Sequence, residues 1–219
     1  MERRKSAKAV GRGGRPSRAE ALHLRQRILQ TARELFLAAG YGSTTIEAVA
    51  ARAGISKRTL YHRFEDKAAL FAAVVHEIIE QIRPPANVPL IEGATLRDVL
   101  RRLAGMILRA ALSPEAMALH RLVMAESTRF PELARAVHSD SSTHEATSLI
   151  AGLLARESRE LKISAENRPF AAEQFIFMVV ALPQRRAMGF GAPMTEAELG
   201  VWADKVVALF LNGCRGWAP

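Results

Sequence analysis

The sequence has one cysteine, few aromatic residues and no long apolar run, and each shortage excludes a class of protein. With Cys214 alone, no disulfide can form within the chain. Aromatic residues make up 6 % of the chain while Ala and Leu are frequent, which favours helices over sheets. The longest apolar run, residues 175–182, is far shorter than the roughly 20 residues of a membrane-spanning helix. Because no apolar segment follows the basic N-terminus, we expect a cytoplasmic protein without a signal peptide.

The motifs of common catalytic and metal sites are also missing. Segment 11–16 is rich in Gly but lacks the Lys-Ser/Thr ending of a phosphate-binding loop, and no G-x-S-x-G motif occurs. His138, Asp140 and His144 are residue types that bind zinc. Their spacing would separate the two histidines on a helix, and their neighbours are Ser and Thr, so we interpret them as an exposed turn. We therefore expect no enzyme, no metal site and no cofactor.

Charge, by contrast, is plentiful and unevenly distributed. Residues 1–83 hold 16 Lys and Arg against 8 Asp and Glu, a net charge of +8. Residues 84–219 hold 15 against 14, a net charge of +1, so nearly all of the chain's +9 lies in its first third. A basic domain attached to a nearly neutral one is typical of proteins that bind a polyanion. A solvated basic surface without a partner is the alternative that charge alone leaves open.

Apolar residues at helical spacing predict four helices in the first third. The first two start at capping boxes, Ser17 with Glu20 and Thr44 with Glu47. The four predicted helices span residues 17–39, 44–53, 56–64 and 66–82. The residues before them, 1–16, are basic and almost free of apolar side chains, so we expect a disordered arm.

A proline-rich segment, residues 84–89, follows the fourth helix and marks a domain boundary, because proline cannot continue a helix. Beyond it, apolar spacing predicts helices over 95–112, 114–127, 131–161, 167–191 and 195–213, with a break or turn at 138–145 and a kink at Pro183. No segment shows the alternation of a strand. The predicted fold is all-α, with a basic arm (1–16), an N-terminal domain (17–83) and a larger helical domain (84–219).

The second and third predicted helices have the pattern of a helix-turn-helix. Ala50 is small enough for two helices to approach closely, and Gly54 permits the turn between them. Ile55 and Leu60 then fill the shared core, which leaves the polar side chains of the third helix facing outward. In helix-turn-helix domains that bind DNA, this helix lies in the major groove.

The outward side chains of the third helix have the chemistry that such a groove requires. Lys57 and Arg58 donate hydrogen bonds to guanine or phosphate, and Thr59 bonds either and offers a methyl group to thymine. Tyr61 and His62 suit phosphate oxygens and the sugar backbone. The alternative for Tyr61 is a packing role against the first helix.

Residues 44–75, TTIEAVAARAGISKRTLYHRFEDKAALFAAVV, resemble the DNA-binding domain of the TetR family of bacterial transcription repressors. The resemblance runs from about Gln26 to Val75 and rests on A-x-x-A-G-I-S followed by T-L-Y-x-x-F-x-x-K. It implies that the residues contacting DNA are Thr44, Thr45, Lys57, Thr59, Tyr61, His62 and Lys67. Thr44, Thr45 and Lys67 would contact phosphate at the starts of the second and fourth helices. Arg58 is our further candidate for contacting a base.

The C-terminal segments 120–137, 171–191 and 206–213 resemble the AefR-like C-terminal domain found on some of these repressors. The resemblance implies an all-helical domain that binds a ligand and forms a homodimer, through about 170–188 and 196–212. Side chains that could line a ligand pocket are Met106, His120, Met124, Phe175 and Met178. A plain core role is the alternative for most of them. His120 is the best candidate because an imidazole in an apolar stretch needs a polar partner.

These observations predict a homodimeric repressor that a small-molecule effector releases from a palindromic operator in double-stranded DNA. The expected switch is a tilt of the fourth helix that changes the spacing of the two recognition helices. A ligand-independent regulator or an activator of the same fold stays open, as does a helical ligand-binding module that recognises no specific DNA.

Overall fold

The computed structural model of the protein describes residues 17–83, 95–138, 141–156 and 163–214, and every regular element within these ranges is a helix. The helices are α1 (Arg18–Ala39), α2 (Ile46–Arg52), α3 (Lys57–Tyr61), α4 (Lys67–Ile82), α5 (Leu96–Ala111), α6 (Pro114–Glu126), α7 (Pro131–His138), α8 (Ser141–Arg156), α10 (Arg168–Ala187) and α11 (Glu196–Cys214). The predicted all-α class is confirmed. The predicted arm, residues 1–16, and the proline-rich boundary lie outside the described residues.

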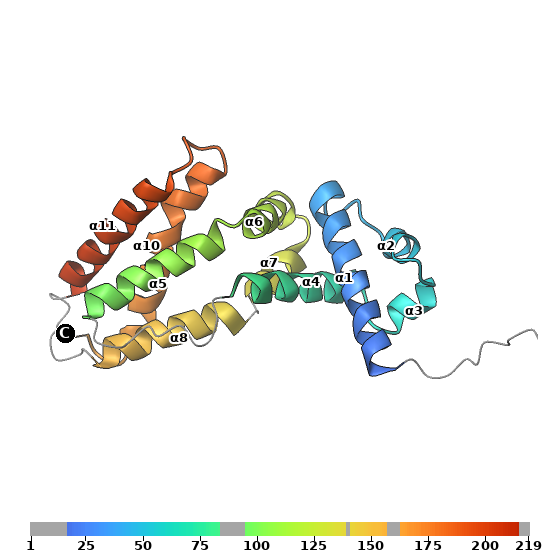
Figure 1. Ribbon diagram of the computed structural model, residues 1–219, viewed down its shortest axis with the longest axis horizontal. Coiled ribbons are helices and arrows are strands. Elements are labelled where there is room, and N and C mark those ends of the chain that lie inside the picture. The colour runs from blue at the N-terminus through green and yellow to red at the C-terminus, as the bar shows by residue number, and fades with distance from the viewer. Residues whose placement is uncertain (1–16, 84–94, 139–140, 157–162, 215–219) are drawn as a thin grey trace, which may run out of the picture.

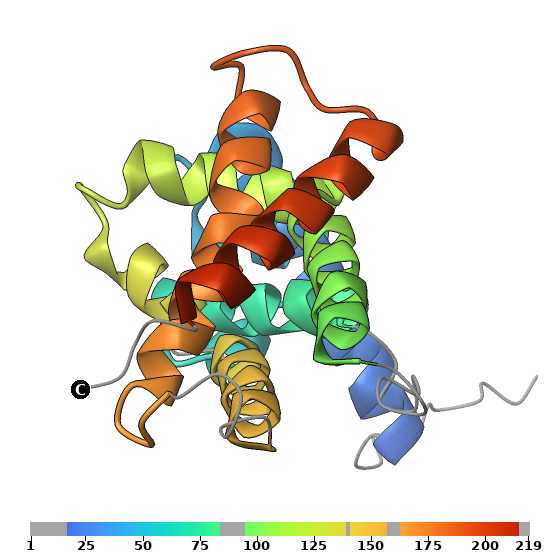
Figure 2. The same cartoon turned by 90° about the vertical axis from the view of Figure 1, so that its left-hand side faces the viewer.

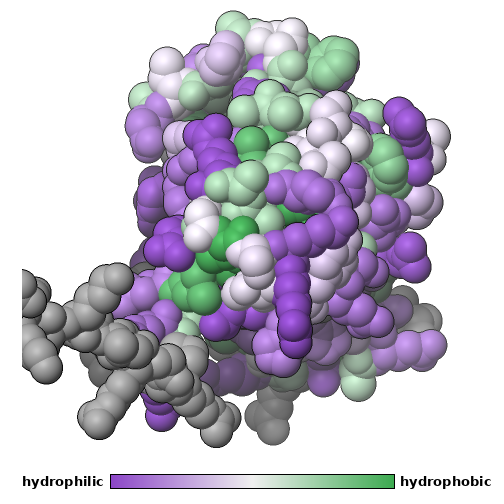
Figure 3. All heavy atoms as spheres, turned by 90° about the vertical axis from the view of Figure 1, so that its right-hand side faces the viewer, coloured by the Kyte–Doolittle hydropathy of each residue, from purple (hydrophilic) through white to green (hydrophobic). Residues whose placement is uncertain are grey.

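The molecule is elongated, with α1, α2 and α3 at one end and α10 and α11 at the other (Figure 1). At the second end α11 crosses in front of α10, with α5 beside it (Figure 2). Seen from the first end, the surface is mainly hydrophilic, with a smaller hydrophobic area near its middle (Figure 3). No helix among the described residues is long and apolar enough to span a bilayer.

Local sequence signals explain most helix ends. The predicted capping box of α1 is present, with Ser17 accepting from the Glu20 N–H and Glu20 accepting from the Ser17 N–H. The start of α2 was predicted one residue too early, because its N-cap is Thr45, which accepts from the Ala48 N–H at 3.1 Å. Segment 131–161, predicted to be helical with a break or turn at 138–145, contains two helices, α7 and α8, and Pro183 lies inside α10.

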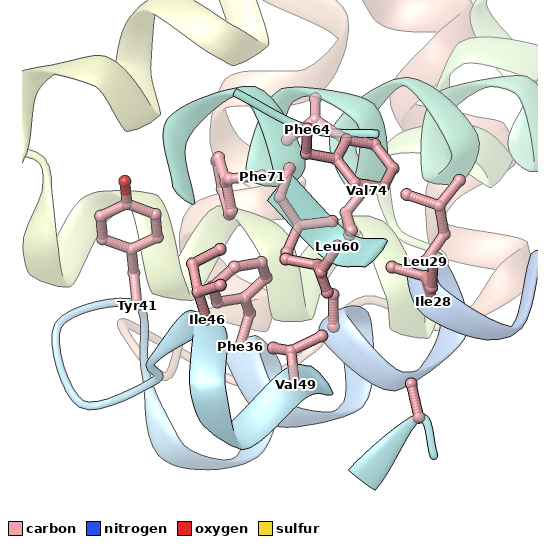
Figure 4. Close-up of a cluster of buried hydrophobic side chains, with 14 of the residues drawn as sticks. Ile28, Leu29, Phe36, Tyr41, Ile46, Val49, Leu60, Phe64, Phe71 and Val74 are labelled. Atoms are coloured by element: carbon pink, nitrogen blue, oxygen red, sulfur yellow. The ribbon is translucent and has the colours of Figure 1, made fainter. Parts of the chain in front are cut away.

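The N-terminal core is built from α1 to α4 around aromatic and aliphatic side chains (Figure 4). Phe36, Tyr41 and Phe71 pack with ring centroids 5.3–5.5 Å apart, and Leu60 of α3 is fully buried among them and their neighbours. α3 has five residues, shorter than predicted, yet Leu60 and Phe64 anchor it to this core. A helix that is too short to be stable alone is therefore held by tertiary packing.

A second core lies between α5, α8, α10 and α11 and contains Phe175 and Phe210, whose ring centroids are 5.1 Å apart. Helices α6 and α7 do not belong to it. Their residues Leu119, Leu122 and Leu133 are buried in the N-terminal core, against α1 and α4. Two helices that follow the predicted boundary after residue 83, α6 and α7, therefore pack with the helices that precede it. We call α1–α4 the head, and the second core with its helices the body.

Candidate nucleic-acid interface

The turn between α2 and α3 sets the angle of the short helix α3. Gly54 has φ +67°, in the left-handed region that favours glycine. The Ile55 N–H donates to the Ala50 carbonyl at 3.0 Å, and Ala50 is itself buried, so the chain turns close against α2. Ser56 then caps α3 by accepting from the Thr59 N–H at 3.1 Å. The predicted helix-turn-helix is present.

One side of α3 is buried and the other faces solvent. We call the exposed side, formed by Lys57, Arg58, Tyr61 and His62, the α3 surface. It carries two permanent cations, a phenol and an imidazole within six residues. These groups are hydrogen-bond donors to phosphate and to guanine edges. The structure thus places four predicted contact residues on one accessible surface.

Lys57 and Arg58 differ in their surroundings. Lys57 forms an ion pair with Glu47 of α2, and its Nζ lies 5.7 Å from the centre of the Tyr61 ring. The hydrogen bond with Glu47 raises the pKa of Lys57 and lowers that of Glu47. Arg58 is exposed, and no ion pair of its guanidinium is found among the described residues. Arg58 is therefore the cation of the α3 surface best placed to bind an external acceptor.

Thr59 is half-buried, and its hydroxyl oxygen lies 2.8 Å from that of Ser56. The two hydroxyls therefore form a polar pair at the N-terminus of α3. Ser56, which was not named from the sequence as a candidate contact, is the exposed member of this pair.

The structure corrects the assignment of Thr44. Its side chain is only 3 % exposed, and its hydroxyl donates to the Gly40 carbonyl at 2.7 Å. Because this hydroxyl closes the turn after α1, it does not face a phosphate. Thr45 is exposed and keeps its predicted place at the start of α2.

Lys67 also differs from expectation. Its ammonium donates to the carbonyls of Tyr41 and Thr44 at 2.9 and 3.0 Å and lies 4.2 Å from the centre of the Tyr41 ring. Burial lowers the pKa of Lys67. Two of its three N–H donors therefore hold the α1–α2 turn, which leaves one donor for the predicted phosphate contact.

Of the five predicted pocket residues, Met106 lines the groove described below and the other four do not. Phe175 is fully buried in the body core, and Met124 of α6 is 63 % exposed. Met178 packs on the same core from outside. His120 is half-buried on α6, where burial and then Arg121 lower the pKa of its imidazole. The spacing of apolar residues predicts which side of its own helix a residue occupies. It does not predict which other helix, if any, covers that side.

Met106 does line a groove, of about 580 Å³, between α5 and α11. Three arginines border it, at 101, 102 and 109, and small residues at 105, 200 and 203 form part of its wall. Arg101 of α5 donates to Asp204 of α11 at 3.0 Å. No group of three or more His, Cys, Asp or Glu that could hold a metal occurs within the part of the chain the structure describes.

The far end of the molecule leaves large apolar side chains uncovered. We call Phe170 and Phe177 of α10 with Val201 and Leu209 of α11 the α10–α11 surface. Phe177 and Leu209 are 66 % and 65 % exposed. The two helices are joined by a hydrogen bond from the Trp202 indole to the Val179 carbonyl at 2.9 Å. These helices coincide with the segments predicted to form a dimer.

Comparison with known proteins identifies both halves of the chain. Residues 28–74 match the family model described as bacterial regulatory proteins, tetR family. Residues 98–213 match that of the AefR-like transcriptional repressor, C-terminal domain. Among curated relatives, the HTH-type transcriptional regulator UidR of Escherichia coli K12 is 33 % identical over 115 residues, 52 % of this chain. The match spans 57 % of that regulator, little more than half its length.

Solved structures extend the likeness to nearly the whole chain. The flavonoid-responsive regulator FrrA superposes with a TM-score of 0.74 at 27 % identity, over 90 % of this chain and 99 % of the other. A TetR-family regulator from Mesorhizobium loti gives 0.69 at 28 % identity, over 90 % and 98 %. Since the C-terminal family model alone matches more than half of the 219 residues, the chain belongs to the TetR family of bacterial DNA-binding transcriptional regulators, and it is not an enzyme.

Proposed function

We propose that this protein is a homodimeric repressor that binds a palindromic operator and is released from it by a small molecule. The α3 surface carries the proposal. Helix α3 buries only Leu60 and exposes Lys57, Arg58, Tyr61 and His62, so most of this side is accessible to a partner outside the chain. Its donors match those that bind phosphates and base edges in the major groove.

The α10–α11 surface supplies the second half of the proposal. Exposed Phe177 and Leu209 would be buried by the same surface of a second chain, which gives an isologous dimer with two-fold symmetry. Two recognition helices related by a two-fold axis require an operator with two inverted half-sites, about one helical turn apart. Such binding takes place in the bacterial cytoplasm, where the DNA is.

Repression and release by a ligand are supported by the relatives. The C-terminal family model is described as that of a repressor, and FrrA is described as responsive to flavonoids. The fold similarity to FrrA extends over the body, where the groove between α5 and α11 offers both apolar walls and cations. A planar, apolar molecule that carries acidic groups is therefore a reasonable first effector to test.

Selection from a random DNA pool tests the proposal. Purified protein is incubated with a pool of duplexes at 150 mM salt, and the bound fraction is amplified and sequenced. We expect an inverted repeat bound at least ~10³-fold more tightly than a shuffled duplex. If the selected duplexes share no repeat, or bind no more tightly than shuffled DNA, the proposal is wrong.

Release is tested on the selected duplex with a set of flavonoids and other aromatic acids. An effector should lower the affinity for DNA by about 5- to 150-fold, and by linkage DNA should lower the affinity for the effector by the same factor. An unchanged affinity across a broad set, including extracts of the host cell, would favour a ligand-independent regulator.

A further inference from the structure

The turn between α1 and α2 is held by a side chain from α6, 85 residues further along the chain. The Tyr41 N–H donates to Oε1 of Glu126 at 2.8 Å, and the Gly42 N–H donates to Oε2 at 2.7 Å. Hydrogen bonds to a carboxylate are about twice as strong as those between neutral groups. We call this pair of bonds the Glu126 latch.

The backbone around the latch is shaped for close approach of the carboxylate. A Cβ atom on Gly42 would lie 3.1 Å from Oε2 of Glu126 and 3.0 Å from the Phe130 ring. A Cβ on Gly40 would lie 2.6 Å from Oε1, and Gly40 has φ +86°. Glycine at both positions lets α6 and α7 approach the turn closely enough for the two bonds to form.

Further contacts from α7 and α4 surround the latch. The buried Tyr41 ring packs edge-on against Phe130 at 5.1 Å, and its hydroxyl donates to Glu132 at 3.1 Å. Lys67 binds the carbonyls of the same turn from the other side. The turn that leads directly into α2 and α3 is thus fixed on several sides.

Helix α6 also contacts the body. Its Arg121 donates to the carbonyl of Ala187, the last residue of α10, at 3.1 Å. One helix therefore joins the end of a proposed dimerisation helix to the turn that carries the recognition helix. The expected connection, α4, contacts the body as well, since Arg83 at its C-terminal cap pairs with Glu145 of α8 at 3.2 Å.

We propose that Glu126 is a positioning residue for operator binding, which fixes the orientation of the head relative to the body so that both α3 helices of a dimer meet their half-sites together. The inference rests on the proposed function. Most buried residues of the N-terminal core belong to α1–α4 and their turns, so a head without the latch is expected to fold and still bind one half-site. What is lost is the fixed spacing that makes binding of the second half-site effectively intramolecular.

The test compares Glu126→Gln with wild-type protein on two duplexes, the selected inverted repeat and the same duplex with one half-site shuffled. Gln has one acceptor oxygen, so only one of the two N–H bonds survives. We expect affinity for the full repeat to fall about 10-fold, within the usual range of coupling between sites, while affinity for the single half-site changes less than about twofold. Hydrogen exchange at the amides of Tyr41 and Gly42 should accelerate.

Glu166→Gln is the matched control, because it removes the same charge from an exposed turn of the body. Gly42→Ala is the second variant, since its Cβ displaces Phe130 and the carboxylate without changing any charge, and it should reproduce the pattern. If Glu126→Gln lost affinity equally for both duplexes, Glu126 would have a role in folding of the head, and the proposal would be overturned. The proposal would also be overturned if Glu126→Gln bound both duplexes as Glu166→Gln does. If wild-type protein does not prefer the inverted repeat to shuffled DNA, the proposed function fails, and this inference with it.

Discussion

The α3 surface and the α10–α11 surface are both left uncovered by the chain, and they differ in chemistry. The first exposes Lys57, Arg58 and His62, while the second exposes Phe177 and Leu209. A surface of cations suits a hydrated, anionic partner whose counterions are released on binding. A surface of large apolar side chains suits a partner that removes them from water. The two ends of one molecule are thus built for two partners, and the predictions below separate them.

The largest expected difference is the response to salt. Binding of the selected duplex should weaken by ~10³ to 10⁵-fold between 50 and 200 mM salt if a dimer makes six to ten phosphate contacts. The dimer itself should persist over the same range, because apolar burial is little affected by salt at these concentrations. Fluorescence anisotropy of labelled DNA and sedimentation of the free protein give the two measurements. If added salt dissociated the dimer as readily as the DNA complex, the two surfaces would not differ in chemistry as described.

Phe177→Glu is expected to prevent dimerisation through the α10–α11 surface. A carboxylate placed at the centre of an apolar interface has no partner to offset its desolvation. We expect a monomer by analytical ultracentrifugation, and an affinity for the inverted repeat lower by about 10²-fold or more, because the two half-sites are no longer bound together.

Leu149→Glu is the control for this variant, since Leu149 is exposed on α8 and lies outside that surface. It should remain dimeric and bind the repeat normally. A dimeric Phe177→Glu variant, or a monomeric Leu149→Glu variant, would place the interface elsewhere.

Arg58→Ala is expected to weaken DNA binding by the α3 surface and to leave the dimer intact. Loss of a bidentate contact to a base costs about 1 to 3 kcal/mol, roughly 5- to 150-fold in affinity, and relaxes selectivity at one operator position. Arg52→Ala is the matched control, because it removes the same charge from α2, where Arg52 pairs with Glu34 at 3.4 Å. If both variants lose affinity equally and keep their selectivity, Arg58 contacts only phosphate.

Thr59→Ala and Tyr61→Ala complete this test of the α3 surface. We expect each to lose operator binding while the dimer stays intact, as judged by sedimentation. An unfolded or monomeric Tyr61→Ala product would instead support a packing role for Tyr61, whose ring lies beside Lys57.

The α3 surface could be predicted from the sequence because its signals are local. Gly54, Ser56 and Leu60 lie within seven residues and together define the turn, the cap and the buried side of α3. The helices of both domains were predictable for the same reason, since apolar spacing and caps act over a few residues.

What the sequence did not reveal depends on contacts between distant residues. Glu126 and Glu132 hold a turn 85 and more residues before them, and no spacing in the sequence indicates that pairing. Lys67 likewise binds the carbonyls of Tyr41 and Thr44, more than 20 residues before it, and the Thr44 hydroxyl binds the Gly40 carbonyl, so both polar groups are engaged in this turn. Phe175 is fully buried and Met124 is exposed, a difference that the sequence did not reveal because a helical pattern does not specify which neighbour covers each face.

The smallest predicted effect lies between the two ends, at Tyr41. Tyr41→Phe removes the hydrogen bond to Glu132 and should lower the free energy of unfolding by about 1 kcal/mol near pH 8. Burial, and then Glu132, raise the pKa of Tyr41 above its ordinary value of 10.0. The folded state therefore retains the phenolic proton at a pH where the unfolded chain releases it, so stability falls as pH rises above about 10.

The Tyr41→Phe variant should lack this part of the pH dependence. The difference in free energy of unfolding between wild-type protein and the variant should therefore shrink between pH 10 and 11. Burial lowers the pKa of Lys67, which acts on stability with the opposite sign, but Lys67 is present in both proteins and is expected to contribute similarly to each. Urea unfolding at pH 8, 10 and 11 supplies the free energies. If the wild-type and variant curves stay parallel to pH 11, the phenol is not held protonated by the head, and the contact of Tyr41 with α7 is weaker than its geometry indicates.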